Sequence, residues 1–188
     1  MRKLHVATLV TLDGVTQDPG GFGETAQGGW AGRHFDAEAV RHAVDKLATV
    51  EVFLCGRVTY QLLSKAWSGN SGEYAEAINR MPKPVASTTL RAPLDWNATL
   101  IDGDVAGRIA ALKRQPGGDI MVYGSATLFD TLLRHGLVDT YQVSVFPLTL
   151  GGGRRLFPDG TAETTFGLAA VEPLRSGIVI LTYRPNGS

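Results

Sequence analysis

The order of apolar runs along the chain limits most strongly how it can fold. Three short runs are typical of buried strands, namely residues 4–12, 50–55 and 120–123. Segments with helical spacing of apolar residues separate them. Three further strand-like segments then follow one another without helices: residues 141–146, 166–171 and 178–183. This order predicts an α/β domain with a mostly parallel central sheet, covered by helices on both faces, and antiparallel C-terminal strands added at one edge.

Capping residues mark the helices between these strands. Asp36 and Asp104 each precede a segment with an inward-facing apolar stripe, so we expect them to act as N-caps. Ser125 stands in the same relation to a third helix, which Gly136 ends. Residues 58–64 and 73–80 are weaker helix candidates, and residues 84–89 and 99–101 are further short strands.

Length and composition exclude several classes of protein. The 188 residues show no repeat or linker, which predicts one domain over residues 1–188. Lys+Arg and Asp+Glu both number 18, so a nucleic-acid partner is not expected. No apolar run reaches the roughly 18 residues of a membrane span. The single Cys55 excludes internal disulfides, and the four histidines lack metal-ligand spacing. The opening residues carry no cleavage site, so we expect a cytoplasmic protein.

Glycine is frequent, at 23 residues, and one cluster fits a known fingerprint literally. Residues 21–26 read Gly-Phe-Gly-Glu-Thr-Ala, which matches the G-x-G-x-x-G/A pattern of dinucleotide-binding turns. That pattern works where a strand turns directly into a helix, whereas this match comes well after the first strand and Gly28-Gly29 follow it. We therefore reject the fingerprint and interpret residues 20–32 as a loop that could cover a ligand.

Three other strand ends carry hydrogen-bond donors in a suitable context. Residues 120–128 run strand, Gly124, helix, which leaves helix N–H groups free for a phosphate; the simpler interpretation is that Ser125 only caps the helix. Residues 53–60 repeat the arrangement with Arg57 at the first helical position. Residues 84–90 end a strand in three hydroxyl side chains. Ligands of open α/β sheets lie at the carboxyl ends of strands, so together these segments predict a phosphorylated ligand.

These segments, in this order, give the chain a resemblance to the dihydrofolate reductase superfamily. The similarity is to its branch related to the reductase (RibD C-terminal) domain of bacterial riboflavin biosynthesis. The matching stretches span nearly the whole chain: residues 11–15, 56–60, 85–90, 122–125, 136–139, 146–147 and 151–158. The resemblance implies a three-layer dihydrofolate-reductase-like fold, NADPH as cofactor and a homodimer.

The resemblance also implies roles for individual residues. The 2′-phosphate and ribose of the adenosine half would be bound by Gly56, Arg57, Thr59, Ser87 and Thr88. The pyrophosphate would be bound by Gly124, Ser125, Ala126 and Thr127. The end of the first strand and the loop beyond it would line the nicotinamide, which assigns Leu9, Thr11, Asp13 and Thr16. Asp13 is as well explained by the turn that Asp-Gly pairs form as by a catalytic role.

The resemblance further implies an NADPH-dependent reductase that transfers a hydride to a small C=N or C=O acceptor, such as a pterin- or pyrimidine-like heterocycle. A riboflavin-pathway reductase of a deaminated pyrimidine is one alternative. Its phosphorylated substrate would need basic partners, for which Arg33, His34 and Arg41 are candidates, although a solvated helix face explains these residues equally well. The other alternative is a non-catalytic nucleotide-binding homodimer, because no proton donor is identifiable.

Overall fold

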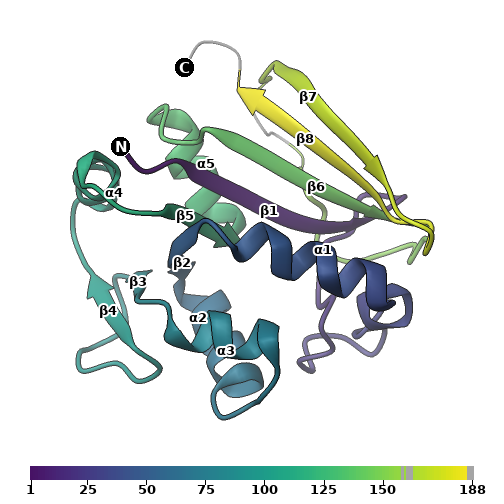
Figure 1. The fold of residues 1–188 in the computed structure, drawn as a ribbon, viewed down its shortest axis with the longest axis horizontal. Coiled ribbons are helices and arrows are strands. Elements are labelled where there is room, and N and C mark those ends of the chain that lie inside the picture. Colours follow the sequence, from purple (N-terminus) through teal and green to yellow (C-terminus); the bar gives the residue numbers. More distant parts are fainter. Residues whose placement is uncertain (158, 160–162, 186–188) are drawn as a thin grey trace.

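A single sheet forms the centre of the molecule in the computed structural model, which describes residues 1–157, 159 and 163–185. Pro158, at the end of the 151–158 stretch, lies outside the described residues. The described strands are β1 (Leu4–Thr11), β2 (Val50–Gly56), β3 (Lys83–Ala86), β4 (Ala98–Ile101), β5 (Asp119–Tyr123), β6 (Thr140–Phe146), β7 (Phe166–Pro173) and β8 (Val179–Pro185). They lie in the order β4-β3-β2-β5-β1-β6-β8-β7 (Figure 1).

The pairing of these strands confirms the predicted sheet. All neighbours from β4 to β6 run parallel, whereas β8 pairs antiparallel with both β6 and β7. The change follows from the connections. Helices lie between most of the parallel strands, although β3 and β4 are joined by a loop. β7 and β8 are joined by a turn at Gly177, whose N–H donates to the carbonyl of Leu174.

The predicted helices are present, with small shifts at their ends. The described helices are a short 3₁₀ helix η1 (Ala31–His34), α1 (Ala37–Leu47), α2 (Arg57–Trp67), α3 (Glu73–Arg80), α4 (Val105–Arg114) and α5 (Ala126–Arg134). Asp36 caps α1 through the N–H of Ala39, and Asp104 caps α4 through that of Gly107, as predicted. Ser125 corrects the third prediction: it occupies the N-cap position of α5, but its side chain makes no capping hydrogen bond.

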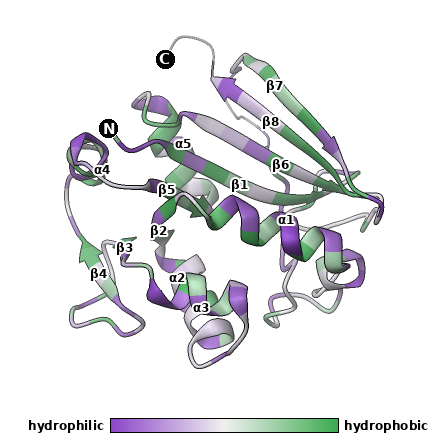
Figure 2. Ribbon diagram, viewed as in Figure 1, coloured by the Kyte–Doolittle hydropathy of each residue, from purple (hydrophilic) through white to green (hydrophobic). Residues whose placement is uncertain are grey.

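The helices cover opposite faces of the sheet, which makes three layers. Leu47 of α1, Tyr60 of α2 and Ile78 of α3 share one buried cluster, while α4 and α5 contribute to another on the far face. Figure 1 shows α1 in front of the sheet and α5 behind it. Alternating apolar and polar stripes are visible along α1 in Figure 2, because only one side of that helix faces the core. This is the three-layer fold expected from the sequence.

Candidate functional site

A large cleft opens where three neighbouring parallel strands end. The strands are β3, β2 and β5, whose carboxyl ends carry the three donor-bearing segments. The cleft has a volume of about 1920 Å³ and extends from these strand ends both along the face under α1 and along α5 on the opposite face. Most predicted cofactor residues line it: Leu9, Thr16, Gly56, Arg57, Thr59, Ser87, Thr88, Gly124, Ser125, Ala126 and Thr127. Sheet order thus brings together segments that are far apart in the sequence.

The turn between β5 and α5 has an unusual backbone. Gly124 and Ser125 are both left-handed, with φ of 56° and 55°, and the second is costly for a residue with a Cβ. This geometry starts α5 abruptly, with Ala126 and Thr127 at the cleft. The first turn of a helix has backbone N–H groups without intrahelical acceptors, and the positive end of the helix dipole lies there. The turn can therefore bind an anion.

The side chain of Ser125 joins this turn to the next strand. Its hydroxyl accepts a hydrogen bond from Gly56 N at 3.1 Å and lies 2.6 Å from Thr59 Oγ1. A Cβ at position 56 would come within 3.0 Å of the Ser125 oxygen, so glycine permits this close approach. Two of the predicted phosphate-binding turns are thereby held in one fixed arrangement.

Arg57 begins α2 at the rim of the cleft. Its side chain is exposed, and Nη1 donates to Gln61 Oε1 at 3.0 Å, one turn along the helix. No carboxylate within the described residues forms an ion pair with it. The guanidinium therefore keeps its charge available for an anionic ligand.

The hydroxyl segment beyond β3 is a turn rather than a strand end. β3 stops at Ala86, and Ser87 Oγ accepts hydrogen bonds from Thr89 N and Leu90 N at 3.1 and 3.0 Å. The local turn uses the Ser87 oxygen as an acceptor, and Ser87 and Thr88 remain at the cleft. The predicted strand over residues 84–89 was thus too long at its carboxyl end.

The structure places Asp13 away from the cleft. Its carboxylate accepts hydrogen bonds from Thr11 Oγ1 at 2.6 Å, from Gly151 N at 2.7 Å and from Leu150 N at 3.2 Å. These bonds, that from Thr11 foremost, lower the pKa of Asp13. Neither Thr11 nor Asp13 is among the residues that line the cleft, whereas Leu9 and Thr16 are. Asp13 anchors a neighbouring loop in this structure, and its catalytic role stays a prediction.

Asp18 organises the glycine-rich loop, a role that the sequence analysis missed. This residue is 1 % exposed, and its carboxylate accepts hydrogen bonds from the backbone N–H groups of Phe22, Glu24 and Thr25. The rejected fingerprint, residues 21–26, is therefore a loop folded around a carboxylate. The pattern of an acidic residue before several glycines was the available signal. Gly20, Phe22 and Glu24 reach the cleft.

Polar side chains under α1 were also missed. His42 and Lys46 of α1 and Gln142 and Ser144 of β6 line the cleft, whereas the candidate basic residues Arg33, His34 and Arg41 do not. Alternation along β6 could have indicated Gln142 and Ser144, because both fall on one face of the strand. Their position opposite α1 could not be predicted, because β6 and α1 are far apart in the sequence.

The described residues contain neither a metal-binding cluster nor a membrane-spanning helix. In the part of the chain with assigned structure, no three His, Cys, Asp or Glu side chains are arranged to hold a metal ion. None of the described helices combines the length and apolar character needed to cross a bilayer.

Comparison with known proteins defines the class of this fold. The chain is similar to the structure of a putative riboflavin biosynthesis protein from Shewanella sp. PV-4, with a TM-score of 0.72, 21% identity and coverage of 98% of this chain and 99% of that one. It is also similar to Enterococcus faecalis dihydrofolate reductase complexed with NADP(H), with a TM-score of 0.65, 14% identity and coverage of 98% and 96%. The protein therefore has a dihydrofolate-reductase-like fold.

The sequence comparison is more specific. The uncharacterized protein YyaP of Bacillus subtilis is 28% identical over 99% of this chain and 96% of its own length. The family model of the RibD C-terminal domain matches residues 2–180. The chain belongs to the RibD C-terminal domain family.

Proposed function

We propose that the protein is an NADPH-dependent reductase that transfers a hydride to a small C=N or C=O acceptor. The observation that carries this proposal is the convergence of three donor-bearing strand ends, β3, β2 and β5, on one cleft. Membership of the RibD C-terminal domain family supports it, as does the likeness in fold to a reductase whose structure holds NADP(H).

The chain's own residues fit a dinucleotide with a 2′-phosphate. In this proposal the first turn of α5, with Ala126 and Thr127, binds the pyrophosphate, because its N–H groups and dipole favour an anion. The unpaired guanidinium of Arg57 binds the 2′-phosphate, with Ser87 and Thr88 beside it. Gly56 permits the close approach of Ser125, which holds the β2 and β5 turns side by side at the cleft.

NADPH, when bound, supplies the hydride, and the protein orients and encloses the reactants. Leu9 and Thr16 would line the nicotinamide at the end of β1. The loop held by Asp18 places Phe22 at the same cleft, where an apolar side chain excludes water.

A riboflavin-pathway pyrimidine reductase is the nearest specific activity. The family and the similarity to a protein named for riboflavin biosynthesis favour it. A phosphorylated substrate would need a cation, and the Lys46 ammonium lines the cleft, whereas the predicted Arg33, His34 and Arg41 do not. Oxidation of NADPH by the phosphoribosylaminouracil substrate of that pathway, followed at 340 nm, distinguishes this activity from a reductase of another acceptor.

A non-catalytic nucleotide-binding protein is the second candidate. The engagement of Asp13 with the backbone of Leu150 and Gly151 favours it, because Asp13 was the one predicted catalytic residue. NADPH binding without turnover on a panel of carbonyl and imine acceptors would support this candidate, whereas acceptor-dependent NADPH oxidation would exclude it.

We also propose that the protein is a homodimer. The edge strand β7 carries Leu168 and Val171, which are 57% and 51% exposed. Their apolar surface is suited to contact with a second copy. Light scattering on the purified chain is expected to give twice the 20.1 kDa of one subunit, and Leu168→Lys with Val171→Lys to give monomer. Monomer mass for the unaltered chain would refute the dimer.

A further inference from the structure

We propose that His42 of α1 is the proton donor of the reduction and delivers a proton from Nε2 to the nitrogen or oxygen of the acceptor. The sequence analysis identified no such group, and the structure engages Asp13 with the backbone of another loop. The inference rests on the proposed function, because it names the residue that completes the reduction in the same cleft.

One lateral row of the sheet connects the expected nicotinamide position with the surroundings of His42. Leu9 of β1 pairs with Ser144 of β6, and Ser144 pairs in turn with Ile180 of β8. Ile180 pairs with Glu172 of β7. Lateral neighbours project from the same face, with strands about 4.8 Å apart. The row therefore has Leu9 at one end and the carboxylate of Glu172 at the other, and the two residues between them carry no ionisable group.

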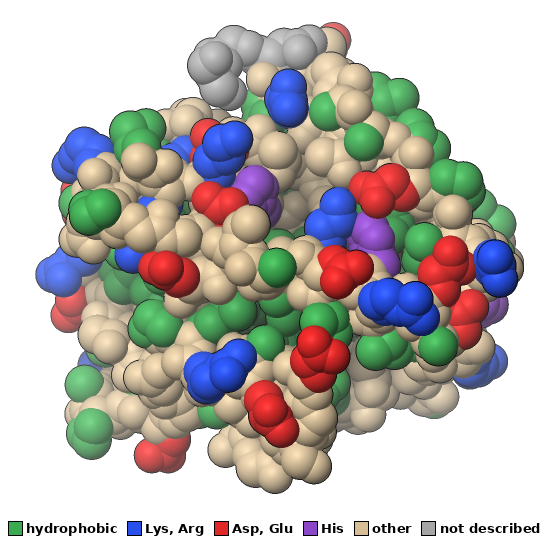
Figure 3. Space-filling model, in the orientation of Figure 1, with side chains coloured by type: hydrophobic (Ala, Val, Ile, Leu, Met, Phe, Trp, Pro, Cys, Tyr) green, Lys and Arg blue, Asp and Glu red, His purple; other side chains and the backbone are tan. Residues whose placement is uncertain are grey.

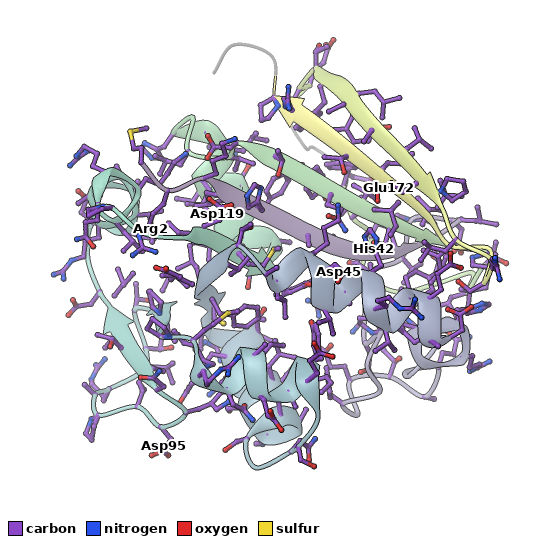
Figure 4. All side chains as sticks on the ribbon, in the orientation of Figure 1. Arg2, His42, Asp45, Asp95, Asp119 and Glu172 are labelled. Carbon is purple, nitrogen blue, oxygen red and sulfur yellow. The ribbon has the colours of Figure 1, made fainter. Side chains whose placement is uncertain are left out.

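The imidazole of His42 is oriented along this row. Its Nδ1 lies 3.6 Å from Glu172 Oε2. Figure 4 shows His42 between α1 and the strand that carries Glu172, with Asp45 farther along the helix. The two ring nitrogens project in nearly opposite directions, so Nε2 points away from β7 and back toward β6 and β1. That is the end of the row where Leu9 would line the nicotinamide.

The Nε2 atom of His42 is free to meet a ligand. It is buried and has no hydrogen-bond partner within the described part of the chain, although the side chain lines the cleft. A buried polar atom normally has a partner, so an orphaned nitrogen at a cleft indicates a group that arrives with the ligand. Ala7 of β1 and Ala39 of α1 also line the cleft. Because each contributes only a methyl group, they leave space beside the ring.

The charged groups around the imidazole come from α1 and β7. Burial lowers the pKa of His42 below 6.5, and Glu172 opposes the shift. Lys46 adds to the shift and Asp45 opposes it. Glu172 Oε1 also accepts from Lys46 Nζ at 3.2 Å, so a partly exposed ion pair stands beside Nδ1. The protonated ring is therefore a stronger acid than a histidine in water, and the carboxylate of Glu172 favours its formation.

Other ionisable side chains at this part of the cleft are less suited to give up a proton. Glu24 forms an ion pair with Arg154 at 3.3 Å and so has none to donate. Burial raises the pKa of Tyr123, which makes its phenol a weaker acid. The ammonium of Lys46 is held by a carboxylate. His42 is the group here that titrates near neutral pH.

The step balances with one proton from the protein. Reduction of a C=N or C=O bond by NADPH places a hydride on carbon and requires a proton on nitrogen or oxygen. The Nε2–H bond of the His42 imidazolium breaks as the new N–H or O–H bond forms. The ring is left neutral, with its remaining proton on Nδ1 toward Glu172, and the coenzyme leaves as NADP⁺. Water in the open cleft then returns a proton to Nε2.

The first test follows His42 by NMR titration and needs no acceptor. NADP⁺ has a positively charged nicotinamide ring, whereas tetrahydro-NADP, an acid-stable analogue, has a neutral one. A positive charge beside an imidazole disfavours its protonated form. His42 should therefore bind a proton at least about threefold more weakly in the NADP⁺ complex than in the tetrahydro-NADP complex. His5, on β1 but outside the cleft, should titrate alike in both complexes.

The second test measures reduction of the phosphoribosylaminouracil substrate by NADPH from about pH 5.5 to 8.5. With the unaltered protein, kcat should fall about tenfold per pH unit above the pKa of His42, because the acid form is lost. His42→Asn should lower kcat about a hundredfold or more and abolish this pH dependence. Its affinity for NADPH, measured by calorimetry, should change less than about twofold.

Glu172→Gln separates a proton donor from a merely structural histidine. Loss of the carboxylate should weaken proton binding by His42 and move the fall in kcat to lower pH. Glu38→Gln is the matched control, because Glu38 also joins α1 to the β7–β8 hairpin, accepting from Arg175 N at 2.9 Å, but does not line the cleft. It should leave the titration and the pH profile unchanged. Thermal melting identifies any variant that fails to fold.

Equal proton binding by His42 in the two coenzyme complexes would overturn the inference, and so would a pH profile that persists in His42→Asn. If the pyrimidine is not reduced, the NMR comparison decides alone. Binding of both coenzymes without a difference at His42 refutes this inference and leaves the proposed function standing. Failure to bind either coenzyme refutes the proposed function and, with it, the role of His42.

Discussion

Single side chains at the strand ends do more than their residue types suggest. Ser125 is the clearest case, because its hydroxyl joins the β5 turn to Gly56 and Thr59 instead of capping α5. The prediction that Ser125 stands at the N-cap position of α5 was right, but the predicted capping hydrogen bond was wrong. A cap is a local pattern that sequence can indicate, whereas a bond across 66 residues depends on the order of strands in the sheet.

Arg57 offers the sharpest test at this scale. Arg57→Ala should weaken NADPH binding about ten- to a hundredfold, since a hydrogen bond to a charged group contributes roughly 1.5–3 kcal/mol. NADH lacks the 2′-phosphate, so its affinity should hardly change. Titration of both coenzymes into both proteins measures the difference. Arg108→Ala, an exposed arginine outside the cleft, serves as control. If the variant lost equal affinity for NADPH and NADH, Arg57 would not be the residue that binds the 2′-phosphate.

Whole elements were predicted more reliably than the loops between them. Helices and strands have periodic apolar patterns, so the sheet, its parallel and antiparallel parts and the caps at Asp36 and Asp104 could be inferred from the sequence. The loop around Asp18 could not, because its order depends on one buried carboxylate. Nor could the approach of His42 to Glu172, which are 130 residues apart on α1 and β7.

Asp18→Ala should loosen the glycine-rich loop. Three backbone N–H groups would lose their acceptor, and we expect the free energy of unfolding to fall by about 2 kcal/mol. Hydrogen exchange at Phe22, Glu24 and Thr25 should accelerate markedly. Asp95→Ala, at an exposed loop position, is the comparison. Unchanged exchange at these three amides would show that Asp18 does not order the loop.

Because Lys83 of β3 is buried, we expect the free energy of unfolding to depend on pH. Lys83 is fully buried, donates to the carbonyls of Met81 and Asn79 and lies 4.4 Å from the Trp96 ring centroid. Burial lowers its pKa from 10.5 to about 8. Between these values the unfolded chain binds more protons than the folded one, so the contribution of Lys83 to stability rises with pH across that window.

The measurement compares denaturant unfolding of the unaltered protein and Lys83→Met at pH 7.5 and pH 10. The unaltered protein should gain stability relative to the variant, on the order of 1–3 kcal/mol. Lys65→Met, at an exposed position on α2, should follow the unaltered protein. A pH-independent difference between the unaltered protein and Lys83→Met would contradict a lowered pKa.

At the scale of the whole molecule, charge is balanced and the cleft is the dominant feature. Figure 3 shows acidic and basic side chains interspersed over one face, consistent with a net charge of zero. Long-range attraction of an anionic coenzyme is therefore weak. Affinity must come from local groups: helix N–H donors, Arg57 and the hydroxyl turn beyond β3. The central claim is that these three strand ends together bind NADPH.

Isothermal titration of the purified chain with NADPH tests this claim most directly. We predict one site per subunit, binding tighter than that of NADH and weakened by higher salt, because the contacts are largely with phosphate. Absence of heat from either coenzyme at millimolar concentration would contradict the proposed binding site, even though the fold would stand.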